Sequence, residues 1–150
     1  MDRKGAATVC LPGSHSKWAS VTDGRIGSFA TYLSGEAFAA LKAGTILGRM
    51  MTDGPPDLDG FDRGLARSGT PGHLLHHLFG VRTHGLFGTL ADSAAAGYLS
   101  GLLIGHEVRA ELGPEPVHLI GAAGLTRLYA RAIEVCGGSA VVLEIGRAHV

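Results

Sequence analysis

A strand–turn–helix–strand pattern occupies the last third of the sequence. The segment VHLIGAAGLTRLYARAI passes from a short apolar run at Val117–Ile120 through small residues into an amphipathic stretch at Leu125–Val135. A second apolar run follows at Ala140–Leu143. Apolar residues at helical spacing between two short apolar runs predict a helix between two strands, and such a unit is typical of α/β domains.

The first third of the sequence carries the pattern of a hairpin. An apolar run at Ala6–Leu11 is followed by two extended runs, Trp18–Thr22 and Arg25–Leu33, which are joined by Asp23 and Gly24. Asp-Gly between two such runs predicts a type I′ turn, because both central residues of that turn need positive φ.

The middle of the sequence is predicted to be helical. Ser34 is placed to cap a helix with Glu36 in its first turn, and a polar loop runs from Thr52 to Gly60. Pro71 at the first position and Gly80 after the last one are expected to bound a further helix. The predicted helices are Gly35–Ala43, Phe61–Arg67, Pro71–Phe79 and Ala91–Leu112. Strands, then helices, then a strand–helix–strand unit predict a mixed α/β domain.

Composition limits the kinds of partner. The 150 residues are 45% hydrophobic and 17% charged, which is enough for one domain with a core, and their net charge is zero. The sequence contains no cluster of lysine or arginine residues that would predict binding to nucleic acid or to an anionic membrane. The longest apolar run, Ala94–Ile104, is shorter than the roughly 20 residues of a membrane span. The zero net charge without such a cluster favours a small ligand. Cys10 and Cys136 lie in separate apolar segments, which favours reduced thiols in a cytoplasmic protein.

The first candidate site is the segment that follows the first strand. Gly13, Ser14, His15, Ser16 and Lys17 combine small residues, hydroxyl groups and one positive charge at the end of an apolar run. Backbone N–H groups, hydroxyls and a lysine in such a turn are suited to bind a phosphate group. An ordinary surface turn has the same composition, and that alternative stays open.

The second candidate site is the turn Gly121–Gly124, in which Ala122 and Ala123 stand between two glycines at a predicted helix start. Backbone N–H groups there can meet a flat or anionic ligand without obstruction. The turn lacks the third glycine of a dinucleotide fingerprint and the lysine of a P-loop. A plain tight connection between strand and helix is therefore the alternative.

Two further patterns are interpreted as structural. His73, His76 and His77 are spaced so that they lie near one face of a helix, as metal ligands often do. No carboxylate or cysteine completes a metal site beside them, so no bound metal is expected. The leucines expected to face the core beside them are Leu74, Leu75 and Leu78. Glycines at every fourth position of the long helix predict close packing against another backbone, and they are Gly97, Gly101 and Gly105.

Four segments together resemble a known kinase family. They are PGSHSKW at Pro12–Trp18, YLSGEAF at Tyr32–Phe38, YLSGLLIGHE at Tyr98–Glu107 and VHLIGAAGLTRLYARA at Val117–Ala132. In order and spacing they are similar to the C-terminal half of the 2-dehydro-3-deoxygalactonokinases, over nearly all of residues 6–143. The resemblance implies a ribonuclease H-like, actin-type ATPase domain, an α/β fold whose mixed sheet has flanking helices. It implies one half of a two-domain kinase of the acetate kinase, heat-shock chaperone and actin superfamily.

The same resemblance implies a reaction and its residues. The reaction is transfer of the γ-phosphoryl group of ATP, with Mg²⁺, to the 6-hydroxyl of 2-dehydro-3-deoxy-D-galactonate in D-galactonate catabolism. By match to the family, the phosphate contacts would be Gly13, Ser14, Ser16 and Lys17. The residues flanking the adenosine would be Gly121, Ala122, Ala123, Gly124 and Thr126. His15 and Glu36 are the candidate catalytic residues, Glu36 because its motif resembles the family's Thr-Gly-Glu.

The family pattern also sets expectations for the ends of the chain. Kinases of this superfamily begin with a comparable N-terminal domain that carries an Asp-x-Gly-Thr phosphate loop. We therefore expect that domain to be a missing partner and the fragment alone to be inactive. The tail from Ile145 to Val150 resembles a translated sequencing adapter, so residues 144–150 are interpreted as non-native after a domain at 1–143. The alternatives are a nucleotide-binding or regulatory module without catalysis, and a truncated product without function.

Overall fold

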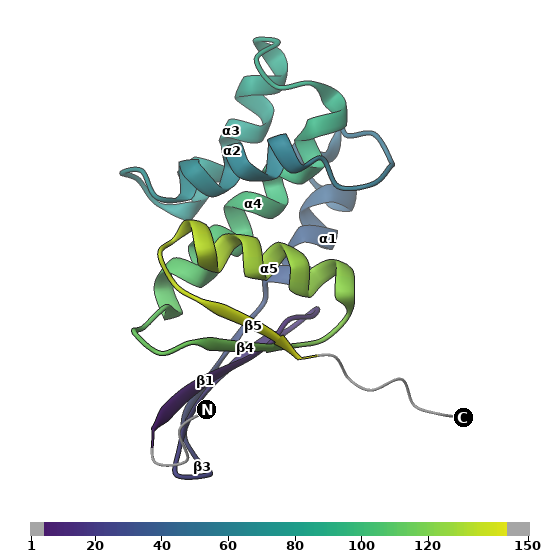
Figure 1. Cartoon of the computed structure of the whole chain (residues 1–150). Helices are drawn as coiled ribbons and strands as arrows, with labels where there is room; N and C mark the ends of the chain where they lie inside the picture. The colour runs from purple at the N-terminus through teal and green to yellow at the C-terminus, as the bar shows by residue number, and fades with distance from the viewer. Residues whose placement is uncertain (1–4, 144–150) are drawn as a thin grey trace, which may run out of the picture. The chain divides into compact units, whose positions relative to one another are not determined.

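The computed structural model of the chain describes residues 5–143 (Figure 1). Its elements are, in chain order, β1 (Ala6–Leu11), β2 (Ser16–Thr22), β3 (Arg25–Tyr32), α1 (Ser34–Gly44), the short 3₁₀ helix η1 (Ile46–Gly48), α2 (Leu58–Ser68), α3 (Leu74–Leu86), α4 (Asp92–Glu111), β4 (Val117–Ile120), α5 (Ala123–Val135) and β5 (Ala140–Leu143). The predicted first, fourth and fifth strands are confirmed at both ends.

The chain is divided into two compact units. The sheet unit consists of residues 5–35 and 110–143 among those described, and it holds the strands and α5. The helical unit consists of residues 36–109 and holds η1, α2, α3 and most of α1 and α4. The non-native tail predicted at 144–150 lies outside the described residues.

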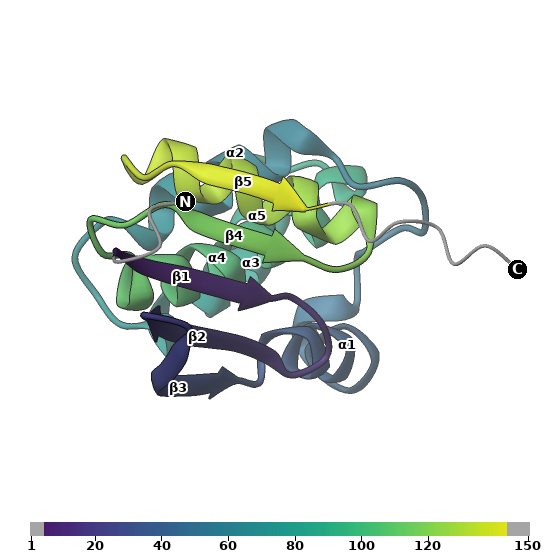
Figure 2. The ribbon, with the colours of Figure 1, turned by 60° about the horizontal axis from the view of Figure 1, so that its bottom comes forward.

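The sheet unit is built on one mixed five-stranded sheet in the order β3-β2-β1-β4-β5 (Figure 2). The first three strands form an antiparallel meander, whereas β1, β4 and β5 are parallel. Parallel neighbours need a crossover connection, and α5 provides it between β4 and β5. This sheet with its helices confirms the predicted α/β fold class.

The core of the sheet unit lies between the sheet and α5. Trp18 and Leu119 flank Cys10 on the neighbouring strands, and all three are nearly inaccessible to solvent. Tyr129 and Ile133 of α5 are buried as well. Neither cysteine forms a disulfide bond, and Cys10 is buried whereas Cys136 is half-buried.

The hairpin turn forms as predicted, with φ of 51° at Asp23 and 75° at Gly24. The start of the second strand was predicted two residues too late. β2 begins at Ser16 because Lys17 pairs with Leu11 of β1 and with Thr31 of β3. Ser16 and Lys17 are therefore strand residues, and residues 12–15 make the turn between β1 and β2.

The core of the helical unit surrounds α4. Tyr98, Leu99 and Leu102 of this helix are each at most 2% exposed and form one cluster with Leu78 and Val81 of α3. Burial of these side chains is the main favourable contribution to the stability of this unit.

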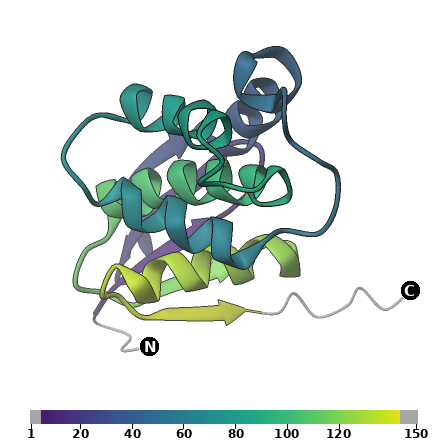
Figure 3. The same cartoon turned by 90° about the horizontal axis from the view of Figure 1, so that it is seen from above.

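Helices α2 and α4 lie side by side and pack backbone to backbone (Figure 3). A Cβ atom added to Gly101 of α4 would lie 2.1 Å from the carbonyl oxygen of Phe61, and one added to Gly64 of α2 would lie 2.1 Å from that of Tyr98. Added Cβ atoms would also meet the opposite helix at Gly60, Gly97 and Gly105. The close packing predicted from the glycines of α4 is confirmed, and α2 supplies matching glycines.

The predicted bounds of α3 were wrong at both ends. The helix begins at Leu74, after Gly72 with φ of 119°, and continues through Gly80 to Leu86. It ends where Gly88 adopts φ of 71° and the amide of Thr89 bonds to the carbonyl of His84, as in a glycine-terminated helix. The glycine that ends the helix is therefore Gly88.

The leucines of α3 also differ from the prediction. Leu78 is buried and Leu74 packs against the core cluster, but Leu75 is 82% exposed. Leu75 precedes the buried His77 by only two residues and so points away from the core.

Among residues 5–143, no helix is both long and apolar enough to cross a membrane.

Candidate functional site

Two of the predicted loops meet at one edge of the sheet. β1 and β4 are adjacent and parallel, with Cys10 opposite Leu119, so the chain leaves both strands at the same edge. The carbonyl oxygen of Pro12 lies 3.5 Å from the position that a Cβ atom on Gly121 would occupy. The segment after β1 and the turn after β4 are thus in contact, and we call this region the carboxyl edge of the sheet.

The start of α1 joins the same edge. A Cβ atom on Gly35 would lie 2.4 Å from the carbonyl oxygen of Gly13 and 2.8 Å from the Cα atom of Ser14. No side chain fits at Gly35, so the backbone of α1 approaches the loop after β1 directly. Glu36 follows in the first turn of this helix and is exposed. Gly35 was not identified from the sequence as part of the site, although its place in the YLSGEAF motif was the available signal.

The loop after β1 presents most of its predicted phosphate contacts to solvent. Ser14, His15 and Lys17 are exposed and Gly13 is half-buried, with open space where a Cβ atom would be. The Lys17 ammonium group donates a hydrogen bond of 3.4 Å to the carbonyl oxygen of His15, so it lies beside the loop.

Ser16 lies differently from the other residues of that set. Its side chain has no exposed surface, and its hydroxyl oxygen accepts a hydrogen bond of 3.3 Å from the hydroxyl of Tyr129 in α5. The bond connects the start of β2 to α5, on the face of the sheet that α5 covers. In this arrangement the Ser16 hydroxyl points into the protein. Tyr129 was not singled out from the sequence, because nothing in the local pattern links it to a residue 113 positions away.

The first turn of α5 has the features of an anion site. Ala122 is the N-cap residue and makes no side-chain capping bond, and Ala123 and Gly124 after it are exposed. A Cβ atom on Gly124 would meet nothing within 4 Å. N–H groups at an uncapped helix start are available to an anionic ligand, and the helix dipole favours negative charge there.

Thr126 faces the interior beneath that turn. It is 2% exposed, and its hydroxyl donates a hydrogen bond of 3.2 Å to the carbonyl oxygen of Ala123. Its methyl group lies 3.6 Å from the position of a Cβ atom on Gly121. Thr126 therefore supports the turn from below, whereas Ala122, Ala123 and Gly124 form its outer surface.

The donor set of this edge suits phosphate better than a metal ion. Within residues 5–143, no group of three or more His, Cys, Asp or Glu side chains is arranged to hold a metal. Mg²⁺ prefers oxygen ligands, commonly carboxylates together with phosphate oxygens of a nucleotide. The described residues therefore offer contacts for phosphate but no carboxylate cluster for Mg²⁺.

The histidine cluster of α3 is part of the packing in the helical unit. His77 is fully buried, with Nε2 3.1 Å from the carbonyl oxygen of Pro71 and Nδ1 2.8 Å from Nε2 of His106. A carbonyl only accepts, so Nε2 of His77 donates to Pro71 and Nδ1 accepts from His106. Desolvation lowers the pKa of His106, and nearby His77 and Arg109 lower it further. No role was predicted for His106, whose partner is 29 residues away in sequence.

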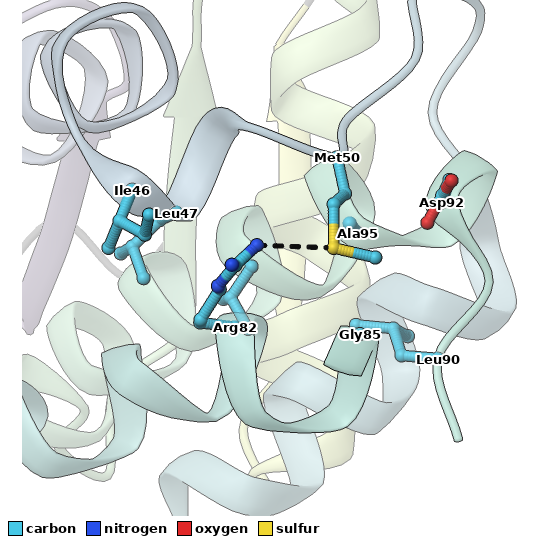
Figure 4. A pocket seen from close by; sticks show the side chains of 9 residues that line it. Ile46, Leu47, Met50, Arg82, Gly85, Leu90, Asp92 and Ala95 are labelled. Carbon is cyan, nitrogen blue, oxygen red and sulfur yellow. Dashed lines mark hydrogen bonds between the residues drawn. The ribbon is translucent and has the colours of Figure 1, made fainter. Parts of the chain in front are cut away.

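A small pocket also lies in the helical unit (Figure 4). Met50, Arg82 and Asp92 are among its lining residues, and the Arg82 guanidinium lies 3.3 Å from the Met50 sulfur. The cavity of about 10 Å³ has room for a single water molecule. It is too small for a nucleotide or a sugar acid.

A model of the family described as 2-keto-3-deoxy-galactonokinase matches residues 1–150 of the chain. The chain belongs to this family. It is 34% identical over 141 residues to a protein of Rhizobium meliloti (strain 1021) described as a probable 2-dehydro-3-deoxygalactonokinase, covering 89% of this chain and 46% of that protein. It is 32% identical over 132 residues to the 2-dehydro-3-deoxygalactonokinase of Escherichia coli (strain K12), covering 85% of this chain and 45% of that protein.

A solved structure agrees with this family assignment. The crystal structure of a candidate 2-dehydro-3-deoxygalactonokinase from Sinorhizobium meliloti has a TM-score of 0.83 and 31% sequence identity, and the match covers 93% of this chain and 49% of that one. The chain spans about half the length of the curated relatives it matches. The predicted resemblance to this kinase family is confirmed.

Proposed function

We propose that this chain is the C-terminal half of a 2-dehydro-3-deoxygalactonokinase and supplies part of its ATP site. The complete enzyme would transfer the γ-phosphoryl group of ATP to the 6-hydroxyl of 2-dehydro-3-deoxy-D-galactonate, a step of D-galactonate catabolism. The family match over residues 1–150 supports the reaction class, and the names of the relatives support the substrate. The bond broken is that between the γ-phosphorus and the β–γ bridging oxygen, and the bond formed joins that phosphorus to the sugar oxygen.

Two predicted loops meet at the carboxyl edge, and their contact is the main support for this proposal. The loop after β1 offers Lys17, the Ser14 hydroxyl and the N–H groups of Gly13 and Ser14, and it contacts Gly121 in the turn that opens α5. Phosphoryl transfer requires chiefly that the phosphates be positioned and their charge compensated. We assign phosphate contacts to Gly13, Ser14 and Lys17, with Ser16 holding the strand behind them.

The outer surface of the α5 turn fits the adenosine side of the nucleotide. Ala122, Ala123 and Gly124 present small side chains or none, so a flat ring can approach the backbone closely. We assign the adenosine contacts to these residues and to Gly121, with Thr126 supporting them from the interior.

The proton-transfer step has two candidate residues. His15 lies on the phosphate loop, and Glu36 follows Gly35, whose backbone touches that loop. A general base must come within hydrogen-bond reach of the sugar hydroxyl. We propose that one of these two residues does so in the complete enzyme. Mg²⁺, when bound, would compensate charge on the phosphate oxygens, and its protein ligands would come from outside the described residues.

The proposal is tested by assaying the complete polypeptide that contains this sequence. Incubation with ATP, Mg²⁺ and 2-dehydro-3-deoxy-D-galactonate should give ADP and a sugar 6-phosphate, detected by ³¹P NMR. The 150-residue chain alone should give no product. ATP binding by the complete polypeptide without phosphate transfer would favour a nucleotide-binding module, and absence of both would overturn the proposal.

A further inference from the structure

One face of the sheet carries no element of the sheet unit. α5 covers the face that holds Ser16 and Trp18, since Tyr129 bonds to Ser16 there. Side chains alternate between the faces of a strand, so the neighbouring residues lie on the opposite face. The strand pairing aligns Phe29, Ala19, Val9, His118 and Val141 in one row across that opposite face. We call it the open face, and it is the face turned toward the viewer in Figure 2.

The open face is largely apolar and accessible to solvent, and Lys17 lies at the end of it that borders the carboxyl edge. Its exposed large side chains are Phe29 (72%), Ile26 (67%), Val141 (41%), Leu143 (41%) and Leu11 (40%). Parallel strands, such as β1, β4 and β5, are normally covered on both faces, and contiguous apolar patches usually mark contact surfaces.

His118 lies at the centre of the same row, between Val9 and Val141 on the neighbouring strands, and its side chain is half-buried. The centre of the open face therefore holds one imidazole ring among apolar side chains.

We infer that the open face is the docking surface for the remaining half of the kinase polypeptide. This inference rests on the proposed function. The matched region is only 45–46% of the curated relatives, so a complete member of the family contains about as much polypeptide again. The docked part presents apolar side chains to Phe29 and β5.

Hydroxyl-radical footprinting of the complete polypeptide tests this inference. Phe87 of the helical unit is 79% exposed and is the matched internal control for Phe29, which has the same chemistry and a similar exposure in this chain. Relative to its rate in denaturant, Phe29 should be oxidised about fivefold or more slowly, as expected for a side chain in an interface core. That protection should not depend on protein concentration.

Two results would overturn the inference. One is oxidation of Phe29 at nearly the denatured rate, and the other is protection that grows with protein concentration, which would identify a second copy as the occupant. A Phe29→Asp variant should raise the oxidation of Leu143 severalfold, whereas Phe87→Asp should not. Phosphotransfer measured on the same samples reports on the proposed function separately, because protection of Phe29 does not require activity.

Discussion

Ser16 and Lys17 are neighbours on β2 whose side chains point to opposite faces of the sheet. Ser16 is buried and bonded to Tyr129, whereas Lys17 is exposed and reaches back to the carbonyl oxygen of His15. Adjacent residues of one motif therefore have different parts in the proposed site. Lys17 can contact a ligand, and Ser16 holds the strand that positions it.

Removing the charge of Lys17 tests its proposed contact with phosphate. In the complete polypeptide, Lys17→Met should weaken ATP binding by about tenfold or more, because a hydrogen bond to a charged group is worth roughly 1.5–3 kcal/mol. The thermal midpoint should change little, since the side chain is exposed. Lys42→Met is the matched control, because the Lys42 ammonium group lies in the helical unit, where it bonds to Asp53 at 3.4 Å. Equal losses in calorimetric titrations of the two variants would contradict the assignment.

The bond between Ser16 and Tyr129 should stabilise the sheet unit. Ser16→Ala and Tyr129→Phe should each lower the free energy of unfolding by about 1 kcal/mol, because each removes this hydrogen bond between two buried side chains. The double variant should lose less than the sum of the two single losses. Urea unfolding of the four proteins measures this coupling, and strictly additive losses would show that the bond does not form.

The contact between α2 and α4 depends on glycines in both helices, each of which lies against the backbone or a side chain of the opposite helix. Alanine is a better helix former than glycine by about 1 kcal/mol, so helix propensity alone would favour alanine at these positions. Steric exclusion outweighs that gain, because a Cβ atom at 2.1 Å from an oxygen forces the helices apart.

A pair of glycine substitutions separates propensity from packing. Gly101→Ala should lower the free energy of unfolding by roughly 2 kcal/mol or more, since α2 must move away from α4. Gly80→Ala is the control, because a Cβ atom there would meet its nearest neighbour, the Tyr98 hydroxyl, at an ordinary 3.5 Å. That variant should gain about 0.5 kcal/mol or more from helix propensity. Chemical denaturation measures both, and a neutral Gly101→Ala would contradict the close packing of α2 against α4.

The bond between His77 and His106 connects α3 to α4 and should make stability depend on pH. The pKa of His106 is below the usual value of about 6.5, so the folded state holds fewer protons than the unfolded state between those two values. The free energy of unfolding should therefore be highest above about pH 6.5, decrease as the pH falls below it, and level off below the folded-state pKa.

His106→Gln tests this pH dependence while keeping a donor for Nδ1 of His77. The variant should lose less stability than the wild type as the pH falls from neutral to mildly acidic, in urea unfolding at a series of pH values. His73→Gln, at an exposed position before α3, should leave the wild-type dependence unchanged. Identical pH profiles for the wild type and His106→Gln would contradict the role given to this pair.

Across the whole molecule, the sequence predicted best what local patterns control. Asp23-Gly24 specified its hairpin turn, and the short apolar runs specified β1, β4 and β5. The bounds of α3 were missed because Gly80 is accommodated inside the helix and Gly88 ends it. The partners of Ser16 and His106 lie far away in sequence, so only the folded chain brings them together. The inward orientation of Ser16 and Thr126 was hidden for the same reason.

In our proposal, the carboxyl edge of the sheet binds the nucleotide of a sugar acid kinase. Gly124→Ala adds one methyl group where this chain has open space, so the fold should be unaffected and only a ligand should meet the new atoms. Gly44→Ala, which also has nothing within 4 Å, is the matched control in α1. We would titrate the complete polypeptide, as wild type and as each variant, with ATP and Mg²⁺ by calorimetry. Our proposal predicts affinity reduced about tenfold for Gly124→Ala alone, which is roughly 1.4 kcal/mol, with unchanged thermal midpoints. Equal affinities for all three proteins would contradict it.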